Sequence, residues 1–217
     1  DAGDAFDDLG SHFAMEDYHV FSMEDIDSEV KDHGIALHVD NVKWAEKQMW
    51  APDANEKGGK YYLFFPAKDY NGIFRIGVAV GENPEGPFTP TDKPIEGSFS
   101  IDPAVYKDDD GEYYMYFGGI WGGQLQRWRN GVFNSNNPTS PTAFLPNDDE
   151  PALLPFIAKM SDDLLEFAEK PREVQILDER GKLLLAGDNE RRFFEAAWVH
   201  KYNGKYYFSY STGDTHF

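Results

Sequence analysis

The sequence predicts an all-β protein, and three features of its 217 residues support that class. Aromatic residues make up 16% of the chain and gather in short runs such as Lys60–Phe65, which suit pleated, half-buried strands. Glycine and proline recur between these runs, as turns between many short strands require. A strand of similar composition also returns along the chain, which indicates a repeated unit.

The repeated strand occupies Gly59–Phe65, Gly111–Phe117 and Gly204–Tyr210. Each copy follows a glycine-containing turn such as Asp110-Gly111 or Asn203-Gly204, and these pairs favour tight hairpins because both central residues need positive φ. The second gap is close to twice the first. Repeats of roughly 40–50 residues built from short strands are typical of β-propeller blades, so the chain predicts part of a propeller.

An inner strand is expected ahead of each turn, over residues 51–54, 101–106 and 195–202. Outer strands are expected over 74–80 and 155–160, and Tyr18–Ser22 is expected to belong to the outer part of an earlier blade. The segment 161–170 is compatible with a short capped helix or with a loop that links strands.

On this arrangement the chain begins inside one blade and ends inside another. A propeller closes as a ring, and an open ring leaves unpaired strand edges. We therefore expect residues 1–217 to form part of a single propeller domain, with the start of the N-terminal blade and one or more C-terminal blades missing. The alternatives are a homo-oligomer in which two copies complete each other, or a complementing fragment.

The net charge of −19, from 39 acidic against 20 basic residues, argues against two classes of partner. A protein surface that binds nucleic acid or an anionic membrane needs clustered Lys and Arg. No run approaches the roughly 18 apolar residues of a membrane-spanning helix. Without cysteine, neither a disulfide framework nor a thiolate metal site is available. The sequence does not decide between cytoplasmic, periplasmic and secreted localisation.

Three carboxylates lie near the starts of the expected inner strands: Asp53, Asp102 and Glu195. The innermost strands of a propeller line its central channel, so their first residues reach the pocket at one end. Each carboxylate has apolar neighbours in the sequence, where an unpaired charge is costly. Taken alone, each could be a turn residue or a satisfied buried acid. Their recurrence at matching positions favours an active site.

Four stretches of this chain resemble glycoside hydrolase family 43. They are Trp-Ala-Pro-Asp at 50–53, Ser-Phe-Ser-Ile-Asp-Pro-Ala-Val at 98–105, Trp-Gly-Gly-Gln-Leu-Gln at 121–126, and Phe-Glu at 194–195 running through Thr-Gly-Asp-Thr-His at 212–216. The resemblance covers most of the chain from about Tyr18 onward. It implies a five-bladed β-propeller, of which this chain supplies roughly three blades. The most similar members are β-xylosidases, some of which also remove α-L-arabinofuranosyl groups.

Members of this family invert the anomeric centre, with one carboxylate acting as base towards water and another as acid towards the leaving oxygen. The resemblance implies that Glu195 is the general acid and that Asp102 orients it and modulates its pKa. Apolar neighbours of Glu195, including Phe193 and Trp198, could supply the desolvation that keeps it protonated.

The family's general base is an Asp near the start of the first blade, and no residue of this chain matches it. Asp1 and Asp4 lie in an acidic lead that resembles the loop after that strand. We therefore expect the isolated chain to be inactive.

The same resemblance implies a xylo- or arabino-oligosaccharide substrate, or arabinoxylan, from which xylose, arabinose or both are released. Trp50 and Trp121 are expected to stack on sugar rings, with core packing as an equal alternative. Phe65 and Phe194 carry the same two alternatives, and Asp53 is included with the substrate-binding residues.

The resemblance also implies a divalent cation, often calcium, held by His216 and water in the central channel. One imidazole is a sparse site for a hard cation that prefers oxygen ligands, and a structural hydrogen bond is the alternative role. The acidic run 108–111 has no EF-hand spacing and predicts a hairpin turn.

Two other functions compete with this interpretation. Propeller enzymes that cleave fructans and sucrose would be expected to carry an Asn-Asp-Pro-Asn motif and a Glu-Cys pair, and this chain has no cysteine. A non-catalytic carbohydrate-binding propeller would keep the aromatic walls without needing Asp102 and Glu195 at matching strand starts.

Overall fold

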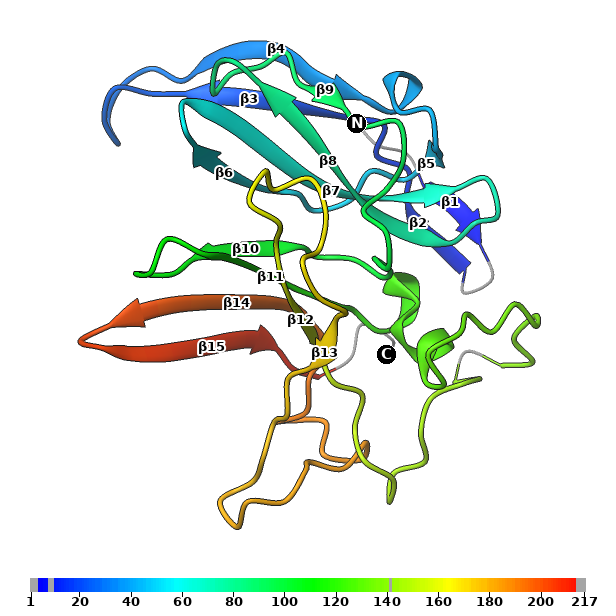
Figure 1. Cartoon of the computed structure of the whole chain (residues 1–217). Coiled ribbons are helices and arrows are strands. Elements are labelled where there is room, and N and C mark those ends of the chain that lie inside the picture. Colours follow the sequence, from blue (N-terminus) through cyan, green and yellow to red (C-terminus); the bar gives the residue numbers. More distant parts are fainter. Residues whose placement is uncertain (1–3, 8–9, 141, 214–217) are drawn as a thin grey trace.

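The computed structural model describes residues 4–7, 10–140 and 142–213 (Figure 1). Within these residues the regular elements are strands and short 3-10 helices, which confirms the all-β prediction. No helix in the described part could span a membrane. In chain order the elements are β1 (Asp4–Asp7), β2 (Gly10–Phe13), β3 (Asp17–Ser22), β4 (Lys31–His38), η1 (Val39–Asn41), β5 (Ala45–Lys47), β6 (Asp53–Lys57), β7 (Lys60–Asp69), β8 (Phe74–Gly81), β9 (Thr89–Pro90), β10 (Ala104–Lys107), β11 (Tyr113–Phe117), η2 (Trp121–Gly123), η3 (Leu125–Trp128), β12 (Phe156–Lys159), β13 (Arg172–Glu173), β14 (Glu195–Tyr202) and β15 (Lys205–Ser211).

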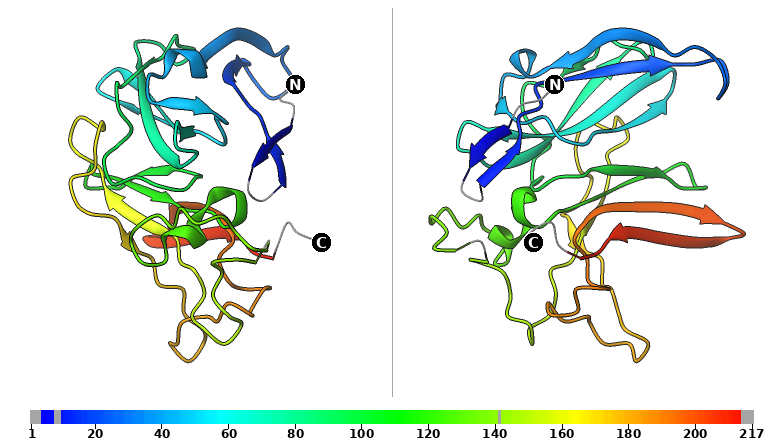
Figure 2. Two further views of the ribbon diagram at one scale, coloured as in Figure 1. Left: turned by 90° about the vertical axis from the view of Figure 1, so that its right-hand side faces the viewer. Right: turned by 180° about the vertical axis from the view of Figure 1, so that it is seen from behind.

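The strands form separate antiparallel sheets, and those that follow the β1–β2 hairpin stack in chain order, as the colour sequence in Figure 2 shows. The pair β3–β4 lies at one end, followed by the sheet β5–β9, the sheet β10–β13 and the pair β14–β15. Strand β10 contacts β6 on one side and β14 on the other. The strands that precede the aromatic repeat in three successive sheets therefore lie next to one another.

The aromatic repeat forms the second strand of each hairpin, as predicted. Strand β7 pairs with β6, β11 with β10, and β15 with β14. The turns use positive φ at Gly59 (79°), Gly111 (88°) and Gly204 (71°), where a residue without Cβ avoids a steric penalty.

Several boundaries differ from the sequence prediction. Strand β10 begins at Ala104, three residues late, because Asp102 has a φ of 55° and Pro103 has no N–H to donate. Strand β6 begins at Asp53, directly after Pro52. The segment 161–170 forms a turn with an isolated bridge between Met160 and Phe167, and not a helix. The hairpin β1–β2 was not predicted.

Strand β7 is buried on both faces and separates two apolar clusters. Leu63 and Phe65 point into the cluster shared with β3 and β4. Tyr62 and Phe64 point to the other side, into the cluster shared with β10 to β12. This alternation follows from the two-residue period of a strand, and it packs the sheets face to face.

Candidate active site

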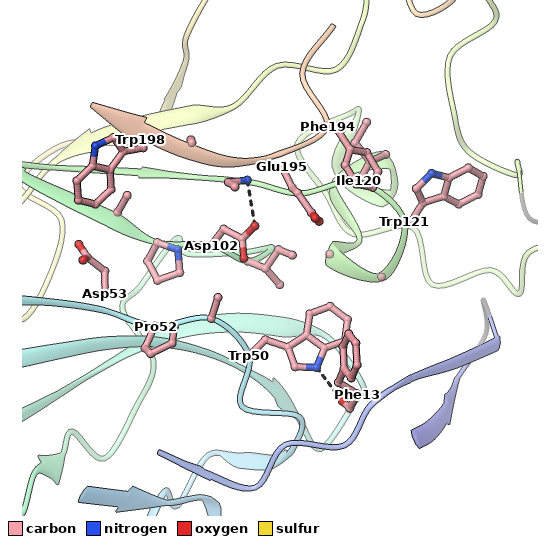
Figure 3. A pocket seen from close by; sticks show the side chains of 18 of the residues that line it. Phe13, Trp50, Pro52, Asp53, Asp102, Ile120, Trp121, Phe194, Glu195 and Trp198 are labelled. Carbon is pink, nitrogen blue, oxygen red and sulfur yellow. Dashed lines mark hydrogen bonds between the residues drawn. The ribbon is translucent and has the colours of Figure 1, made fainter. Parts of the chain in front are cut away.

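A pocket of about 960 Å³ opens where β6, β10 and β14 begin (Figure 3). Six of the residues predicted from the sequence line it: Trp50, Asp53, Asp102, Trp121, Phe194 and Glu195. Among the described residues, the carboxylates that line the pocket are those of Asp53, Asp102 and Glu195. Their common place at the starts of neighbouring strands is the arrangement that the repeat predicts.

The turn before β10 is held in an unusual backbone conformation. Ser100 and Asp102 have φ values of 63° and 55°, which residues other than glycine rarely adopt. The fully buried Ser100 hydroxyl donates to the Gly123 carbonyl at 2.7 Å and accepts from the Gly119 N–H at 2.9 Å. The Gly118 N–H also donates to the Ile101 carbonyl at 2.8 Å. The surrounding structure thus fixes the backbone that carries Asp102.

Two glycines allow this turn to pack closely against the segment 118–123. A Cβ added at Gly119 or Gly123 would lie 2.7 Å from the side chain of Ile101. At Gly119 it would also lie 3.3 Å from the Cβ of Glu195. The absence of a side chain at Gly119 and Gly123 therefore lets this segment approach Ile101 closely.

Glu195 also lies on an irregular backbone. The pairing of β14 with β15 shifts register between Glu195 and Trp198, and Ala196 has a φ of 59°. Such bulges redirect side chains at active sites. The Ala196 N–H donates to Asp102 Oδ2 at 3.0 Å, which ties the two carboxylate turns together (Figure 3).

Burial changes the acidity of all three carboxyl groups. It raises the pKa of Glu195 above 4.5, as a general acid requires. Burial, followed by the nearby charge of Glu195, raises the pKa of Asp102 to about 7, against the opposing hydrogen bond from Ala196. Burial also raises the pKa of Asp53, although the hydrogen bond from the Val105 N–H partly offsets it. The pocket therefore shifts all three carboxyl groups towards their protonated forms.

Asp53 joins two sheets as well as lining the pocket. Its Oδ2 accepts from the Val105 N–H at 2.5 Å, and Asn55 Nδ2 donates to the Val105 carbonyl at 2.6 Å. Two side chains of β6 thus satisfy both backbone groups of one residue in β10. One carboxylate oxygen of Asp53 is therefore already used within the fold.

The predicted aromatic residues fall into two groups. Trp50 lines the pocket, donates from Nε1 to the Phe13 carbonyl at 2.8 Å and packs on Phe74 with ring centroids 4.6 Å apart. Trp121 and Phe194 line it from a small apolar cluster. Phe65 lies elsewhere, because it is fully buried against Trp44 with ring centroids 5.8 Å apart. Phe65 is a core residue in this structure and does not line the pocket.

The structure adds lining residues that the sequence did not reveal. Phe13 and Met15 come from the N-terminal segment, which reaches the pocket through the Met49 N–H bond to the Met15 carbonyl. Trp198, predicted only as an apolar neighbour of Glu195, also lines the pocket and is 52% exposed. No local motif marks Phe13 or Met15, because long-range backbone pairing brings them to the pocket.

The predicted metal ligand, His216, lies outside the described residues. Within the described part, no three His, Asp or Glu side chains lie close enough to hold a metal ion. The acidic run 108–111 forms a hairpin turn, in which the Gly111 N–H donates to the Asp108 carbonyl at 3.0 Å. The prediction of a hairpin turn at 108–111 is therefore confirmed.

Residues 10–142 match the family model of the glycosyl hydrolases family 43. The chain belongs to this family. A curated xylosidase/arabinosidase of Bacteroides ovatus is 58% identical over 217 residues, and the match covers all of this chain and 65% of that protein. Xylosidase/arabinosidase 43A of Humicola insolens is also 58% identical, over 98% of this chain and 66% of its own length. The chain thus spans about two thirds of these family 43 relatives.

A solved family 43 structure has the same arrangement of strands. CoXyl43, a β-xylosidase/α-arabinofuranosidase from a compost microbial metagenome, is 60% identical and superposes with a TM-score of 0.91. The match covers 99% of this chain and 66% of that one. That crystal structure is a complex with xylotriose in a calcium-free form.

Replacing Asp102 with Asn should change how stability depends on pH. The carboxyl binds its proton more tightly in the folded state, with a pKa of about 7 against an ordinary value of 3.8. Its stabilising contribution to the free energy of unfolding is therefore complete below about pH 4, and this contribution is lost as the pH rises through 7. Relative to the native protein, Asp102→Asn should gain free energy of unfolding between pH 4.5 and 7.5, measured by urea denaturation. A difference that stays constant across this range would contradict the assignment.

Proposed function

We propose that the complete protein is an inverting glycoside hydrolase that releases xylose, arabinose or both from xylo-oligosaccharides or arabinoxylan. The observation that carries this proposal is the shared pocket of Glu195 and Asp102, whose pKa values are both raised. Inverting glycosidases need one carboxyl group that remains protonated until it meets the leaving oxygen.

We also propose that the stacked sheets are blades of a five-bladed β-propeller, of which this chain supplies roughly three. The contacts of β10 with β6 and β14 support this arrangement, because inner strands of successive blades lie side by side around a channel. The similarity to CoXyl43 supports it further.

In the proposed reaction Glu195 is the general acid. Its carboxyl group lies in the pocket beside the apolar surface of Phe194 and Ile120, where the charged form is disfavoured. The neutral group would donate its proton to the glycosidic oxygen as the bond to the anomeric carbon breaks. The departing sugar would leave as an alcohol, so no high-energy alkoxide forms.

Asp102 is a positioning residue in this scheme. It accepts the N–H of Ala196, the residue after Glu195, and its charge state is linked to that of Glu195. When Asp102 is ionised, its charge would favour the protonated form of Glu195.

No described residue is assigned as the general base. That group would activate water on the opposite face of the sugar, about 6.5–9.5 Å from the acid. Asp53 is the remaining carboxylate of the described pocket, and its bond to Val105 holds one oxygen within the fold. Asp53 is therefore proposed as a substrate-binding and structural residue.

Aromatic walls support a sugar as the substrate. Trp50, Trp121 and Phe194 border the carboxylates, and apolar faces of pyranose and furanose rings pack well on aromatic rings. The relatives named xylosidase/arabinosidase and the xylotriose complex of CoXyl43 point to pentoses linked through oxygen.

Replacing Glu195 with Gln in the complete protein should separate catalysis from binding. Without a proton donor, kcat on xylotriose should fall by about 10²–10⁴-fold while KM changes little. A nitrophenyl xyloside should lose much less activity, because its leaving group needs little protonation. Exposed Glu190→Gln is the matched control and should retain full activity. Equal losses on both substrates, or unchanged turnover, would contradict the role of Glu195, and sugar binding without turnover in the native protein would indicate a binding module.

We further propose that the complete protein binds a divalent cation such as calcium through His216. The family resemblance and the description of CoXyl43 as a calcium-free form support this, while the described residues contribute no ligand cluster. Chelation of the complete protein should lower its thermal unfolding temperature, and added calcium should restore it. His216→Ala should abolish that response. A protein whose unfolding temperature ignores both chelator and calcium would refute the proposal.

A further inference from the structure

The backbone on both sides of the Glu195 side chain is held by one residue of β15. The Phe194 N–H donates to the Ser211 carbonyl at 2.9 Å, and the Ser211 hydroxyl donates to the Glu195 carbonyl at 3.1 Å. Glu195 and Ser211 are also paired in the sheet, just before the register shift of β14. The place of Glu195 in the pocket therefore depends on the place of Ser211.

The chain after Ser211 turns back to the loop that precedes β14, drawn in orange in Figure 1. There the Gly213 N–H donates to the Asn189 carbonyl at 2.8 Å. Asn189 lies in a turn in which the Asp188 carbonyl accepts the Arg192 N–H at 2.8 Å. Asn189 thus connects the segment that follows β15 to the segment that leads into β14.

The side chain of Arg192 completes this connection. It is 7% exposed, and its Nη2 and Nε donate to Asn189 Oδ1 at 2.7 and 3.0 Å. Its Nη1 donates to the Phe193 carbonyl at 3.3 Å. Hydrogen bonds and the covalent chain together form a closed ring, which passes through Arg192, Glu195, Ser211, Gly213 and Asn189.

The choice of arginine suits a role in fixing geometry. Burying a guanidinium is costly unless its donors are satisfied, and its planar fork holds its partners in fixed directions. Arg192 and Asn189 are not among the described residues that line the active-site pocket. Any effect of this pair on the reaction therefore passes through the backbone that carries Glu195.

We propose that Arg192 and Asn189 are positioning residues for the general acid Glu195. The pair closes the hydrogen-bonded ring and thereby sets the direction in which the Glu195 carboxyl group meets the glycosidic oxygen. Displacements near 1 Å can reduce a rate by about 10²-fold. The assignment rests on the proposed function, because a positioning role needs Glu195 to be the acid.

Asn189→Ala in the complete protein removes the acceptor of Arg192 from an exposed turn. On xylotriose, whose leaving sugar needs a proton, kcat should fall by about tenfold or more while KM changes little. On a nitrophenyl xyloside, whose leaving group needs little protonation, the loss should be much smaller. Asn189→Asp keeps an oxygen for Arg192 and should retain the native rates, as should the exposed matched control Glu190→Ala. Equal losses on both substrates would indicate a general structural role and overturn the proposal.

Two further variants test the pair independently of Asn189→Ala. Arg192→Lys keeps the positive charge but loses the planar fork, so it should show the same selective loss on xylotriose. Native rates in Arg192→Lys would contradict the proposal.

The double variant Asn189→Ala/Glu195→Gln should be no slower on xylotriose than Glu195→Gln, because residues that act as a unit have non-additive effects. Additive losses would also contradict the positioning role. If Glu195→Gln itself loses equal activity on both substrates, the proposed function fails. If Glu195→Gln is selective and Asn189→Ala is not, only the positioning role fails.

Discussion

The segment 118–123 is the support on which both carboxylates depend. It binds the turn before β10 through the Ser100 hydroxyl and the Gly118 N–H, and it binds the start of β14 through the Ile120 N–H, which donates to the Phe194 carbonyl at 3.0 Å. Ile101 fits between Gly119 and Gly123 only because neither has a Cβ. Backbone angles that are unfavourable in isolation persist here because the surrounding contacts fix them.

This support holds carboxyl groups in a buried environment. The burial that favours their protonated forms also lowers the stability of the fold when they ionise. The burial that raises the pKa of Asp102 to about 7 makes its ionised form unfavourable near neutral pH. The fold limits this penalty with backbone donors, which include the Ala196 N–H for Asp102 and the Val105 N–H for Asp53. Strained, partly desolvated groups of this kind are common at catalytic sites.

The sequence predicts what local patterns determine and misses what tertiary contacts determine. Aromatic strands beside Asn-Gly and Asp-Gly turns identified the hairpins, and the matching places of Asp102 and Glu195 identified the pocket. The late start of β10 was missed because packing on the segment 118–123 imposes the positive φ of Asp102. For Phe65 the sequence left sugar stacking and core packing open, because strand periodicity gives a face without telling what that face contacts, and the structure places it in the core. Phe13 reaches the pocket from a segment whose long-range pairing no local pattern predicts.

Gly119→Ala in the complete protein tests the central claim that this support sets the catalytic geometry. The added methyl group would press on Ile101 at 2.7 Å and on the Cβ of Glu195 at 3.3 Å. Displacements near 1 Å can reduce a rate by about 10²-fold. We predict that kcat on a xylotriose substrate falls by about that factor while the protein still unfolds cooperatively and binds xylose. A folded Gly119→Ala protein with the native kcat would contradict the account.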